Sequence, residues 1–389
     1  MVNNKDVSLV NFSTSNCACF AEETKLDLLC DEKENHFSYA MLSCSDKIKV
    51  VPVCLVTGAN SIGKTMLLNL ISTMCKTVAS NQIKPIEPFR YDETYRTKPS
   101  KLAVVLSVGG LCYEYGFELM CQDGQFQIQQ EWLEPDLETL TPIHNSSYIL
   151  SFRRVRKEGN FETTCNSSMI QEFREKVEYE VKYTSNESLL LCSLVDFDDV
   201  KKMLNWFRAT TYISQDDVDV DDITVREELV NLAKKLDPTI DDIIIKQGIY
   251  VERKTIHTSL ASESKGLKRL LGTIAPAVYR ALDTGGLLLV DEIENSFNPF
   301  VIAHFMKLFQ VHFRNPNKAQ LIFTTHNSFI MQKRFLRSEQ VCFTEKDENS
   351  TCKLCSVYDF YAKTQDAYHN RTWGEDYLQG VFVNQSDMS

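Results

Sequence analysis

The fold is decided by one stretch, Gly58-Ala59-Asn60-Ser61-Ile62-Gly63-Lys64-Thr65, which matches the phosphate-binding loop pattern G-x-x-x-x-G-K-[ST]. The preceding residues 50–56 (VVPVCLV) are typical of a short buried strand, and residues 66–74 (MLLNLISTM) favour a helix. A strand, a glycine loop and a helix in this order place backbone N–H groups and a helix N-terminus around phosphates. We therefore expect Lys64 to reach the β- and γ-phosphates and the Thr65 hydroxyl to bind Mg²⁺.

Composition is that of an ordinary globular chain. The 389 residues allow one large domain or two to three ordinary ones, with 43% hydrophobic and 24% charged residues. A net charge of −11 argues against a chain-wide grip on nucleic acid or on an anionic membrane. Residues 1–10 lack the pattern of a signal peptide, and the apolar runs are too short to span a bilayer. We expect a cytoplasmic protein.

The cysteines and one acidic run raise the question of metal sites. The chain has 13 cysteines, an odd number that does not suggest a disulfide framework. Cys17-x-Cys19 and Cys352-x-x-Cys355 are close pairs, but we favour structural roles, and the segment around Cys352 reads as a strand. Residues 216–222 (DDVDVDD) lack the turn glycine of an EF-hand loop, so we interpret them as a solvated loop.

The middle of the chain predicts an antiparallel sheet followed by helices. Residues 102–108, 112–120 and 126–132 are rich in β-branched and aromatic residues and are separated by hairpin-turn glycines. Further along, helices are expected at 169–179, 198–207 and 225–236, a strand at 148–152 and a hairpin at 243–254. The basic run 153–157 (RRVRK) is interpreted as a solvated face, with a contact to nucleic acid or a partner as the alternative.

Two strands in the C-terminal third complete a nucleotide site. Residues 286–290 form a buried strand that ends in Asp291-Glu292, where Asp291 would hold the Mg²⁺ water shell and Glu292 would polarise the attacking water. An acidic pair that only caps a helix is the alternative. Residues 321–326 form another apolar strand, and His326 at its end could contact the γ-phosphate.

Ser264 and Gly266 begin a long predicted helix, 27 residues before Asp291. The order of P-loop, Ser-x-Gly helix, Asp-Glu strand and histidine strand resembles that of the ABC-type ATPase head. The resemblance implies that Ser264 and Gly266 contact the γ-phosphate of ATP bound to a second subunit, in a head-to-tail dimer with two ATPs. The glutamine that such heads use at Mg²⁺ cannot be placed, and Gln130 and Gln215 are the candidates.

A closer resemblance is to the RloA-like, OLD-related AAA ATPases of bacterial defence loci. It rests on short segments along the chain: Asn11-Phe12, Tyr113–Phe117, Glu131–Leu133, Leu236-Asp237, Ile240–Ile243, Glu263–Arg269, Asp291-Glu292, Phe323–His326 and Tyr377–Gly380. Lys265 and Asn298 depart from the family pattern. The resemblance implies an ATP-driven assembly that senses phage infection and regulates a separate effector, a TOPRIM-type nuclease.

These observations predict an α/β fold, a P-loop NTPase of ABC-head type with an added antiparallel β-sheet and a helical insert. We expect residues 1–389 to form a single head, with a P-loop lobe at 1–133, a mostly helical insert at 134–235 and a lobe at 236–389 that holds the signature, Asp291 and His326. The cofactors would be ATP and Mg²⁺. Two other classes stay open: a DNA-repair ATPase head that acts on DNA directly, and the nucleotide-binding subunit of a transporter.

Overall fold

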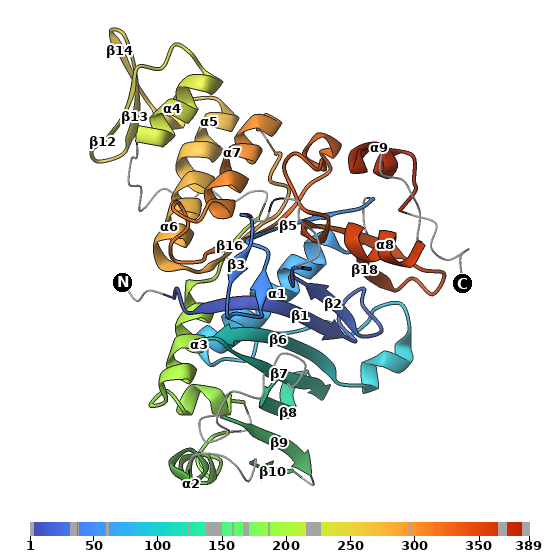
Figure 1. Ribbon diagram of the computed structural model, residues 1–389. Coiled ribbons are helices and arrows are strands. Elements are labelled where there is room, and N and C mark those ends of the chain that lie inside the picture. The colour runs from blue at the N-terminus through green and yellow to red at the C-terminus, as the bar shows by residue number, and fades with distance from the viewer. Residues whose placement is uncertain are drawn as a thin grey trace.

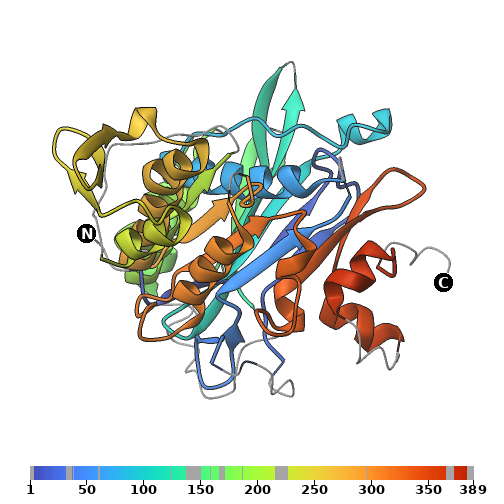
Figure 2. The ribbon, with the colours of Figure 1, turned by 90° about the horizontal axis from the view of Figure 1, so that it is seen from above.

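The computed structural model describes residues 4–31, 37, 39–59, 62–122, 124–136, 150–157, 159–165, 171–185, 187–214, 227–295, 297–364 and 372–382. Two stacked sheets form the body, with a smaller helical part above them and the last helices at one side (Figure 1). Seen from above, the small sheet β12–β14 and the C-terminal helices lie at opposite ends of the molecule (Figure 2). The predicted residues Asn60, Ser61, Gln215 and 216–222 lie outside the described part.

The central sheet is mostly parallel and contains the strand that leads to the P-loop. In the described chain its order is β11-β15-β16-β5-β17-β18, with β17 and β18 antiparallel. The strands are β5 (Val53–Thr57), β11 (Thr211–Ile213), β15 (Leu287–Val290), β16 (Gln320–Thr324), β17 (Val341–Lys346) and β18 (Cys352–Ser356). The strands predicted around 50–56, 286–290 and 321–326 are confirmed, although β16 ends two residues before His326.

The central sheet is buried on both faces. Val53 and Leu55 of β5 enter one hydrophobic core, whereas Cys54 and Val56 enter the other. Because successive side chains of a strand point to opposite faces, both sets must be apolar. This explains why the run before the P-loop shows no alternation of polar and apolar residues.

The second sheet is antiparallel and has the order β10-β9-β8-β7-β6-β1-β2 among the described residues. Its strands are β1 (Val7–Ser15), β2 (Thr24–Asp27), β6 (Ser100–Val108), β7 (Leu111–Gln122), β8 (Gln125–Pro135), β9 (Phe152–Lys157) and β10 (Asn160–Thr164). The predicted meander is therefore confirmed as β6–β8. Strands β9 and β10 extend it, so the basic run 153–157 is part of a strand. Of the strand predicted at 148–152, residues 148 and 149 lie outside the described part, residues 150 and 151 are not in a strand, and Phe152 begins β9.

The helices lie in two groups. The helices α1 (Lys64–Ser80) and α3 (Asp198–Ala209) pack between the sheets, and α2 (Gln171–Glu180) lies near β9 and β10 (Figure 1). The other face of the central sheet is covered by α4 (Glu227–Leu236), α5 (Lys265–Arg269), α6 (Ala275–Thr284) and α7 (Pro299–Gln310). At the C-terminal side are α8 (Val357–Thr364) and α9 (Trp373–Leu378). No helix in the described ranges combines the length and the apolarity needed to cross a membrane.

Two small sheets complete the fold. A ribbon is formed by β3 (Leu42–Ser43) and β4 (Lys49–Val50), and a three-stranded sheet by β12 (Asp242–Ile245), β13 (Ile249–Arg253) and β14 (Ile256–Ser259). The hairpin predicted at 243–254 is confirmed by β12 and β13, whereas β14 was not predicted. The predicted helix from Ser264 onward contains a π segment, Leu270–Ile274. Pro276 at the start of α6 has no N–H to bond an earlier carbonyl, which favours this local widening.

A buried glutamine joins the two sheets. Gln320, at the start of β16, accepts the Leu9 N–H at 2.6 Å and donates to the Leu9 carbonyl at 2.9 Å. Its amide also donates to the Val51 carbonyl at 3.3 Å. The register of β1 against β6 shifts between Leu9 and Asn11, which marks a bulge at this point. The side chain of Gln320 thus satisfies backbone groups where the ladder is irregular.

A buried ion pair anchors the far side of the antiparallel sheet. Arg154 of β9 and Glu131 of β8 approach to 2.6 Å, and neither side chain is exposed to solvent. Glu131 also accepts the Tyr115 hydroxyl at 3.0 Å and the N–H groups of Leu190 and Leu191 at 2.9 and 3.1 Å. The interpretation of the basic run as a solvated face is therefore wrong for Arg154, because alternate residues of β9 face the interior.

We predict that Glu131→Gln destabilises the fold by about 3–5 kcal/mol, because it leaves the buried Arg154 charge without its partner. The matched control is Glu134→Gln, which breaks the neighbouring pair with Arg153. In that pair both side chains are 37% exposed, so the expected cost is about 0–1 kcal/mol. Urea unfolding of both variants measures the difference. Equal losses of stability would show that the buried pair is no stronger than the exposed one.

Candidate nucleotide site

The P-loop begins where β5 ends and β17 runs beside it. Gly58 has φ +148°, and an added Cβ would lie 2.3 Å from Thr344 Oγ1 of β17. Gly63 has φ +95° and precedes the first residue of α1. Both positions have positive φ and too little space for a side chain, so glycine is required at each. The exposed N–H groups at the start of α1 have no side-chain cap, which suits an anion.

Lys64 lies folded against its own loop. Its Nζ donates to the carbonyl oxygens of Gly58 and Ala59 at 2.9 and 2.8 Å. Burial lowers the pKa of Lys64, while the carboxylates of Asp291, Glu292 and Glu294 raise it in part. Lys64 therefore lies close enough to Asp291 and Glu292, the acidic pair predicted to complete the site, for their charges to act on it.

The acidic residue Asp291 meets the P-loop directly. Thr65 Oγ1 donates to Asp291 Oδ2 at 2.9 Å, although the two residues are 226 positions apart. Thr324, at the end of β16, donates to Asp291 Oδ1 at 2.6 Å. The three residues follow or end the neighbouring strands β5, β16 and β15, whose carboxyl ends meet at one sheet edge. Asp291 is almost fully buried, with 2% exposure.

Glu292 adopts an unusual backbone conformation. Its φ is +46°, which is uncommon for a residue with a side chain. Its N–H donates to Thr324 Oγ1 at 2.7 Å, so a single threonine holds both Asp291 and Glu292. Backbone strain of this kind is often found at functional sites.

A cavity of about 510 Å³ opens over these groups. Its lining consists of Cys19, Ile62, Gly63, Lys64, Thr65, Met66, Arg90, Tyr91, Glu292 and His326. The structure thus brings the P-loop, Glu292 and His326 together. His326 is exposed, and its backbone N–H donates to Glu294 Oε1 at 2.5 Å.

Three lining residues outside the P-loop and the helix that follows it were not assigned from the sequence. Arg90 and Tyr91 come from the proline-rich loop after α1, and Cys19 comes from the turn between β1 and β2. Arg90 adds a cation beside the phosphate loop, and Tyr91 adds a half-exposed ring, 49% exposed. None of them belongs to a motif, so their placement depends on long-range packing.

Ser264 and Gly266 are not among the residues that line this cavity. Ser264 caps α5, because its hydroxyl accepts the Leu267 N–H at 3.3 Å. A contact between this pair and a nucleotide on a second subunit stays a prediction. Gln130 lies in β8 of the antiparallel sheet, away from the cavity lining.

Two unpredicted contacts connect the signature segment to its surroundings. Arg269, near the end of α5, donates to the carbonyl oxygens of Asp291 and Glu292 at 3.3 and 3.4 Å. At the other end, Arg253 of β13 binds both carboxylate oxygens of Glu263 at 2.7 and 2.8 Å. The helix that begins at Ser264 is therefore fixed both to the small sheet and to the acidic strand end.

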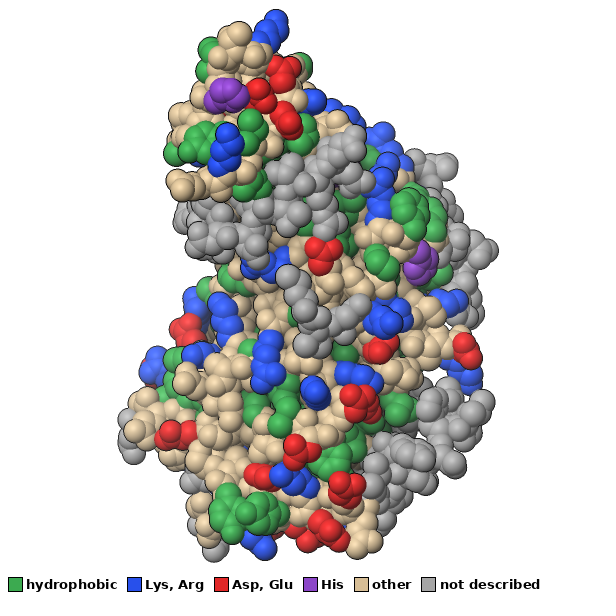
Figure 3. All heavy atoms as spheres, turned by 90° about the vertical axis from the view of Figure 1, so that its left-hand side faces the viewer, with side chains coloured by type: hydrophobic (Ala, Val, Ile, Leu, Met, Phe, Trp, Pro, Cys, Tyr) green, Lys and Arg blue, Asp and Glu red, His purple; other side chains and the backbone are tan. Residues whose placement is uncertain are grey.

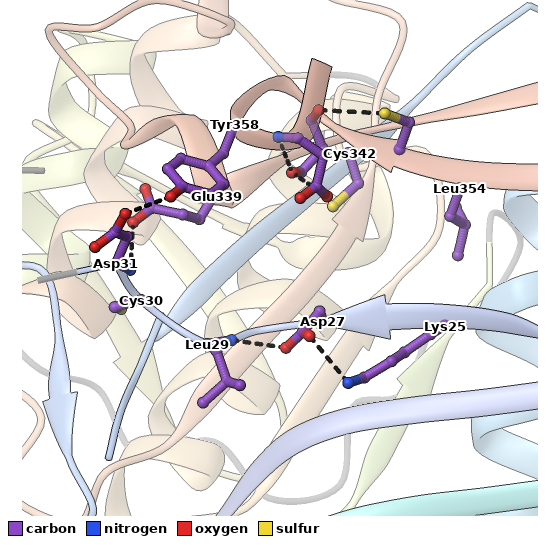
Figure 4. A pocket seen from close by; sticks show the side chains of 12 residues that line it. Lys25, Asp27, Leu29, Cys30, Asp31, Glu339, Cys342, Leu354 and Tyr358 are labelled. Carbon is purple, nitrogen blue, oxygen red and sulfur yellow. Dashed lines mark hydrogen bonds and ion pairs between the residues drawn. The ribbon is translucent and has the colours of Figure 1, made fainter. Parts of the chain in front are cut away.

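A second cavity, of about 250 Å³, lies between β2 and the segment 339–359 (Figure 4), and its lining includes four carboxylates and one lysine beside mostly apolar, cysteine and hydroxyl side chains. The Tyr358 hydroxyl donates to Asp31, and the Asp31 N–H donates to Glu339 at 3.0 Å. Asp27 pairs with Lys25 at 3.1 Å. With four carboxylates and one lysine in this lining, the cavity over the P-loop is the better candidate for a triphosphate.

The fold and this site define a P-loop ATPase domain of the AAA class. Residues 53–332 match the model of the family described as "AAA domain, putative AbiEii toxin, Type IV TA system", and the chain belongs to this family. The predicted fold class, an α/β P-loop NTPase of ABC-head type with an added antiparallel sheet and a helical insert, is confirmed. No curated protein matches the chain.

The solved structures that are similar to this chain include three SMC head domains. The SMC head domain from Thermotoga maritima has 11% identity and a TM-score of 0.38, with 90% of this chain and 98% of that chain covered. The SmcHead bound to the C-winged helix domain of ScpA has 10% identity and a TM-score of 0.42, with 92% and 99% covered. An Smc head domain with an extended coiled coil, bound to the C-terminal domain of ScpA derived from Pyrococcus furiosus, has 12% identity and a TM-score of 0.41, with 92% and 100% covered. These values are too low to support an inference about what this chain binds.

We predict that Thr324→Val slows ATP turnover about 10- to 100-fold, the usual effect of removing a group that orients a metal ligand. The change leaves Asp291 Oδ1 and the Glu292 N–H without their hydroxyl partner. Thr324→Ser is the matched control, because it keeps the hydroxyl and should retain most of the activity. The measurement is steady-state turnover at saturating Mg²⁺. If valine and serine have the same effect, the hydroxyl does not position the acidic pair.

Proposed function

We propose that this protein binds ATP with Mg²⁺ in the cavity over the P-loop, hydrolyses it, and uses ATP to assemble with a second copy of itself. The observation that carries the proposal is the 2.9 Å contact between Thr65 and Asp291. A P-loop threonine and a strand-end aspartate in contact are the pair expected to share one magnesium ion.

The residues present fit a magnesium ion. Mg²⁺ prefers hard oxygen ligands and usually keeps several waters beside one or two carboxylates and the substrate phosphates. Thr65 and Asp291 supply such oxygens, and Thr324 fixes the orientation of the Asp291 carboxylate. In the described ranges no group of three His, Cys, Asp or Glu residues could hold a metal ion alone. The ion would therefore rely on the nucleotide for part of its coordination, neutralising charge on the phosphates when bound.

The remaining polar groups have roles that follow from their positions. Lys64 would exchange the carbonyl oxygens of Gly58 and Ala59 for phosphate oxygens of the nucleotide. Residues 58–63, including Asn60 and Ser61, would supply backbone N–H groups to the phosphates. Arg90 would add charge at the cavity border.

Hydrolysis would need a base for water and a contact with the γ-phosphate. Glu292 lines the cavity, and its backbone is held by Thr324, so we assign it as the general base. His326 lines the same cavity, and its segment is fixed by Glu294, which suits a sensor of the γ-phosphate. Positioning and electrostatics supply the catalysis, with no covalent intermediate on the protein.

The signature segment supports a composite site. Ser264 and Gly266 stand at the beginning of the long helix, outside the cavity of their own chain, where the ABC resemblance assigns them to ATP on a partner. Arg269 connects the same helix to the carbonyl groups of Asp291 and Glu292. A second subunit that docks on this helix would therefore act on Asp291 and Glu292 through the Arg269 side chain. We also propose that residues 1–389 form a single head. Its three segments are the P-loop lobe (1–133), the mostly helical insert (134–235) and the lobe with the signature, Asp291 and His326 (236–389).

The cellular role that we propose is control of a separate effector in anti-phage defence, with a TOPRIM-type nuclease as the partner. Its support is the resemblance to the RloA-like, OLD-related ATPases. The description of the matched family, which names a putative toxin of a type IV toxin–antitoxin system, also concerns bacterial conflict. Co-purification of such a nuclease with the ATP-bound chain tests this role. A nuclease that binds neither the ATP-bound nor the ATP-free chain would contradict it.

Charge does not favour direct action on DNA. The net charge is −11, and basic and acidic side chains are interspersed among the described residues of the face shown in Figure 3. DNA binding by a head of this kind would need a concentrated basic surface. A DNA-stimulated turnover is therefore the result that would favour the DNA-repair alternative.

We predict that Glu292→Gln lowers ATP hydrolysis by at least about 100-fold, in line with loss of a general base, and leaves ATP binding intact. ATP–Mg²⁺ should then hold the variant in a larger assembly. Turnover and light scattering after size-exclusion chromatography measure both effects, with and without duplex DNA.

The matched control is Glu162→Gln, a neutralised carboxylate on β10 whose side chain is 62% exposed. It should behave like the unmodified chain in both assays. If Glu292→Gln and the control hydrolyse ATP equally, Glu292 is not the base. If neither chain assembles with ATP, the composite site is wrong.

A further inference from the structure

Two cysteines from distant parts of the chain meet beside the P-loop. Cys19 lies in the turn between β1 and β2, and Cys352 is the first residue of β18. The Cys352 N–H donates to the Cys19 carbonyl at 2.8 Å. This hydrogen bond places the two backbones next to each other, as bridging by a disulfide requires. Both cysteines are free thiols.

The neighbouring residues tie the same two segments together. The Ala21 N–H donates to Thr351 Oγ1 at 2.8 Å, and Thr24 Oγ1 donates to the Cys352 carbonyl at 3.4 Å. The turn after β1 and the start of β18 are therefore held in a fixed relation. A bond between the thiols would need only small side-chain movements, because the backbones are already joined.

The sulfur atoms lie against a P-loop glycine. A Cβ placed on Gly63 would lie 2.9 Å from Cys19 Sγ and 3.1 Å from Cys352 Sγ. Cys19 also lines the nucleotide cavity. The two thiols thus occupy the space beside the residue whose N–H group helps to enclose the phosphates.

The surroundings make one thiol more acidic than the other. A hydrogen bond from Cys19 lowers the pKa of the Cys352 thiol, and the positive charge of Lys346 acts in the same direction. The contact with Cys352, together with burial, raises the pKa of the Cys19 thiol. Within the pair, loss of a proton is therefore favoured at Cys352, although its burial acts in the opposite direction.

We propose that Cys19 and Cys352 form an oxidative modification site, a reversible disulfide whose formation weakens ATP binding at Gly63. The effect on ATP rests on the proposed function, whereas formation of the bond does not.

The chemistry requires a peroxide as the oxidant. The Cys352 thiolate attacks hydrogen peroxide, which gives a sulfenic acid and hydroxide, and the hydroxide takes up a proton to become water. The Cys19 sulfur then attacks the sulfenic sulfur, the S–S bond forms, and the hydroxyl group leaves with the Cys19 proton as a second water. Two thiols lose two electrons and two protons to one peroxide. A dithiol such as dithiothreitol reverses the step by exchange.

The disulfide would alter the wall of the nucleotide cavity beside the P-loop. Both sulfur atoms lie beside Gly63, and Cys19 lines the cavity. A bonded sulfur pair is only about 2.05 Å apart, so the two thiols must turn toward each other from these positions. The turn that carries Cys19 would then pack differently against the loop at Gly63, which would weaken the contacts of the loop N–H groups with a phosphate.

A second thiol pair provides an internal comparison. Cys54 of β5 and Cys342 of β17 have their Sγ atoms 3.7 Å apart. Their contact and burial raise the pKa of Cys342 far above its usual value, and neither residue lines the nucleotide cavity. Proximity alone would predict oxidation of this pair as well, whereas of the two pairs it is Cys19 and Cys352 that have a member lining the cavity through which peroxide can enter.

The experiment treats the full-length chain with hydrogen peroxide, with and without later dithiothreitol. Peptide mapping by mass spectrometry locates the disulfide, and calorimetric titration measures ATP affinity. We expect a Cys19–Cys352 bond and at least a tenfold weaker ATP affinity, restored by dithiothreitol. For Cys352→Ser and for Cys19→Ser, the ATP affinity of each variant should be the same before and after treatment with peroxide. Cys121→Ser, a cysteine of β7 outside the cavity, is the matched control and should respond as the unmodified chain does.

The outcomes separate the two proposals. If mapping finds no Cys19–Cys352 bond, the modification site is overturned. If it finds the bond with unchanged ATP affinity, the proposed effect on ATP binding is overturned. If the reduced chain binds no ATP, the proposed function fails and takes the regulatory effect with it, and mapping still reports whether the bond forms. If a cysteine variant folds poorly, the comparison of oxidised and reduced unmodified chain decides alone.

Discussion

The hydrogen-bonded carboxylate of Asp291 is the interaction on which the functional part of the structure depends. It is almost fully buried, and its two oxygens accept the hydroxyls of Thr65 and Thr324. A buried carboxylate without such partners would be strongly destabilising. The contact is possible because β16 lies between β5 and β15, so that the three strands present their ends together. The same geometry places the P-loop beside Glu292 and His326 in one cavity.

The local elements of the site could be predicted from the sequence, because each one has a local signal. The P-loop glycines and the apolar strands that lead to Asp291 and His326 are continuous motifs. The order of the strands in the sheet brings the P-loop and the two strand ends together. This order can be predicted only from the resemblance to a family whose strand order is known. Arg90, Tyr91 and Cys19 have no motif, and the chain brings them to the cavity through packing of distant segments. No sequence pattern therefore identified them.

The errors have similarly physical causes. A basic run was interpreted as a solvated face, but Arg154 is inside because β9 alternates and Glu131 compensates the charge. That partner lies on another strand, so the run alone gives no sign of it. Burial and the adjacent Glu131 raise the pKa of Tyr115 well above its usual value, which keeps its hydroxyl a donor. Gln320 of β16 likewise hydrogen-bonds the backbone of β1 at Leu9. Because the two residues are far apart in the sequence, no local pattern predicts this contact.

The central claim is that the contact between Thr65 and Asp291 marks an ATP–Mg²⁺ site. Calorimetric titration of the purified, reduced chain with ATP, first with Mg²⁺ and then with a chelator in its place, tests it most directly. The account predicts saturable binding of one ATP per chain that weakens strongly when Mg²⁺ is removed. ATP binding that is equally tight without Mg²⁺, or no binding at all, would contradict it.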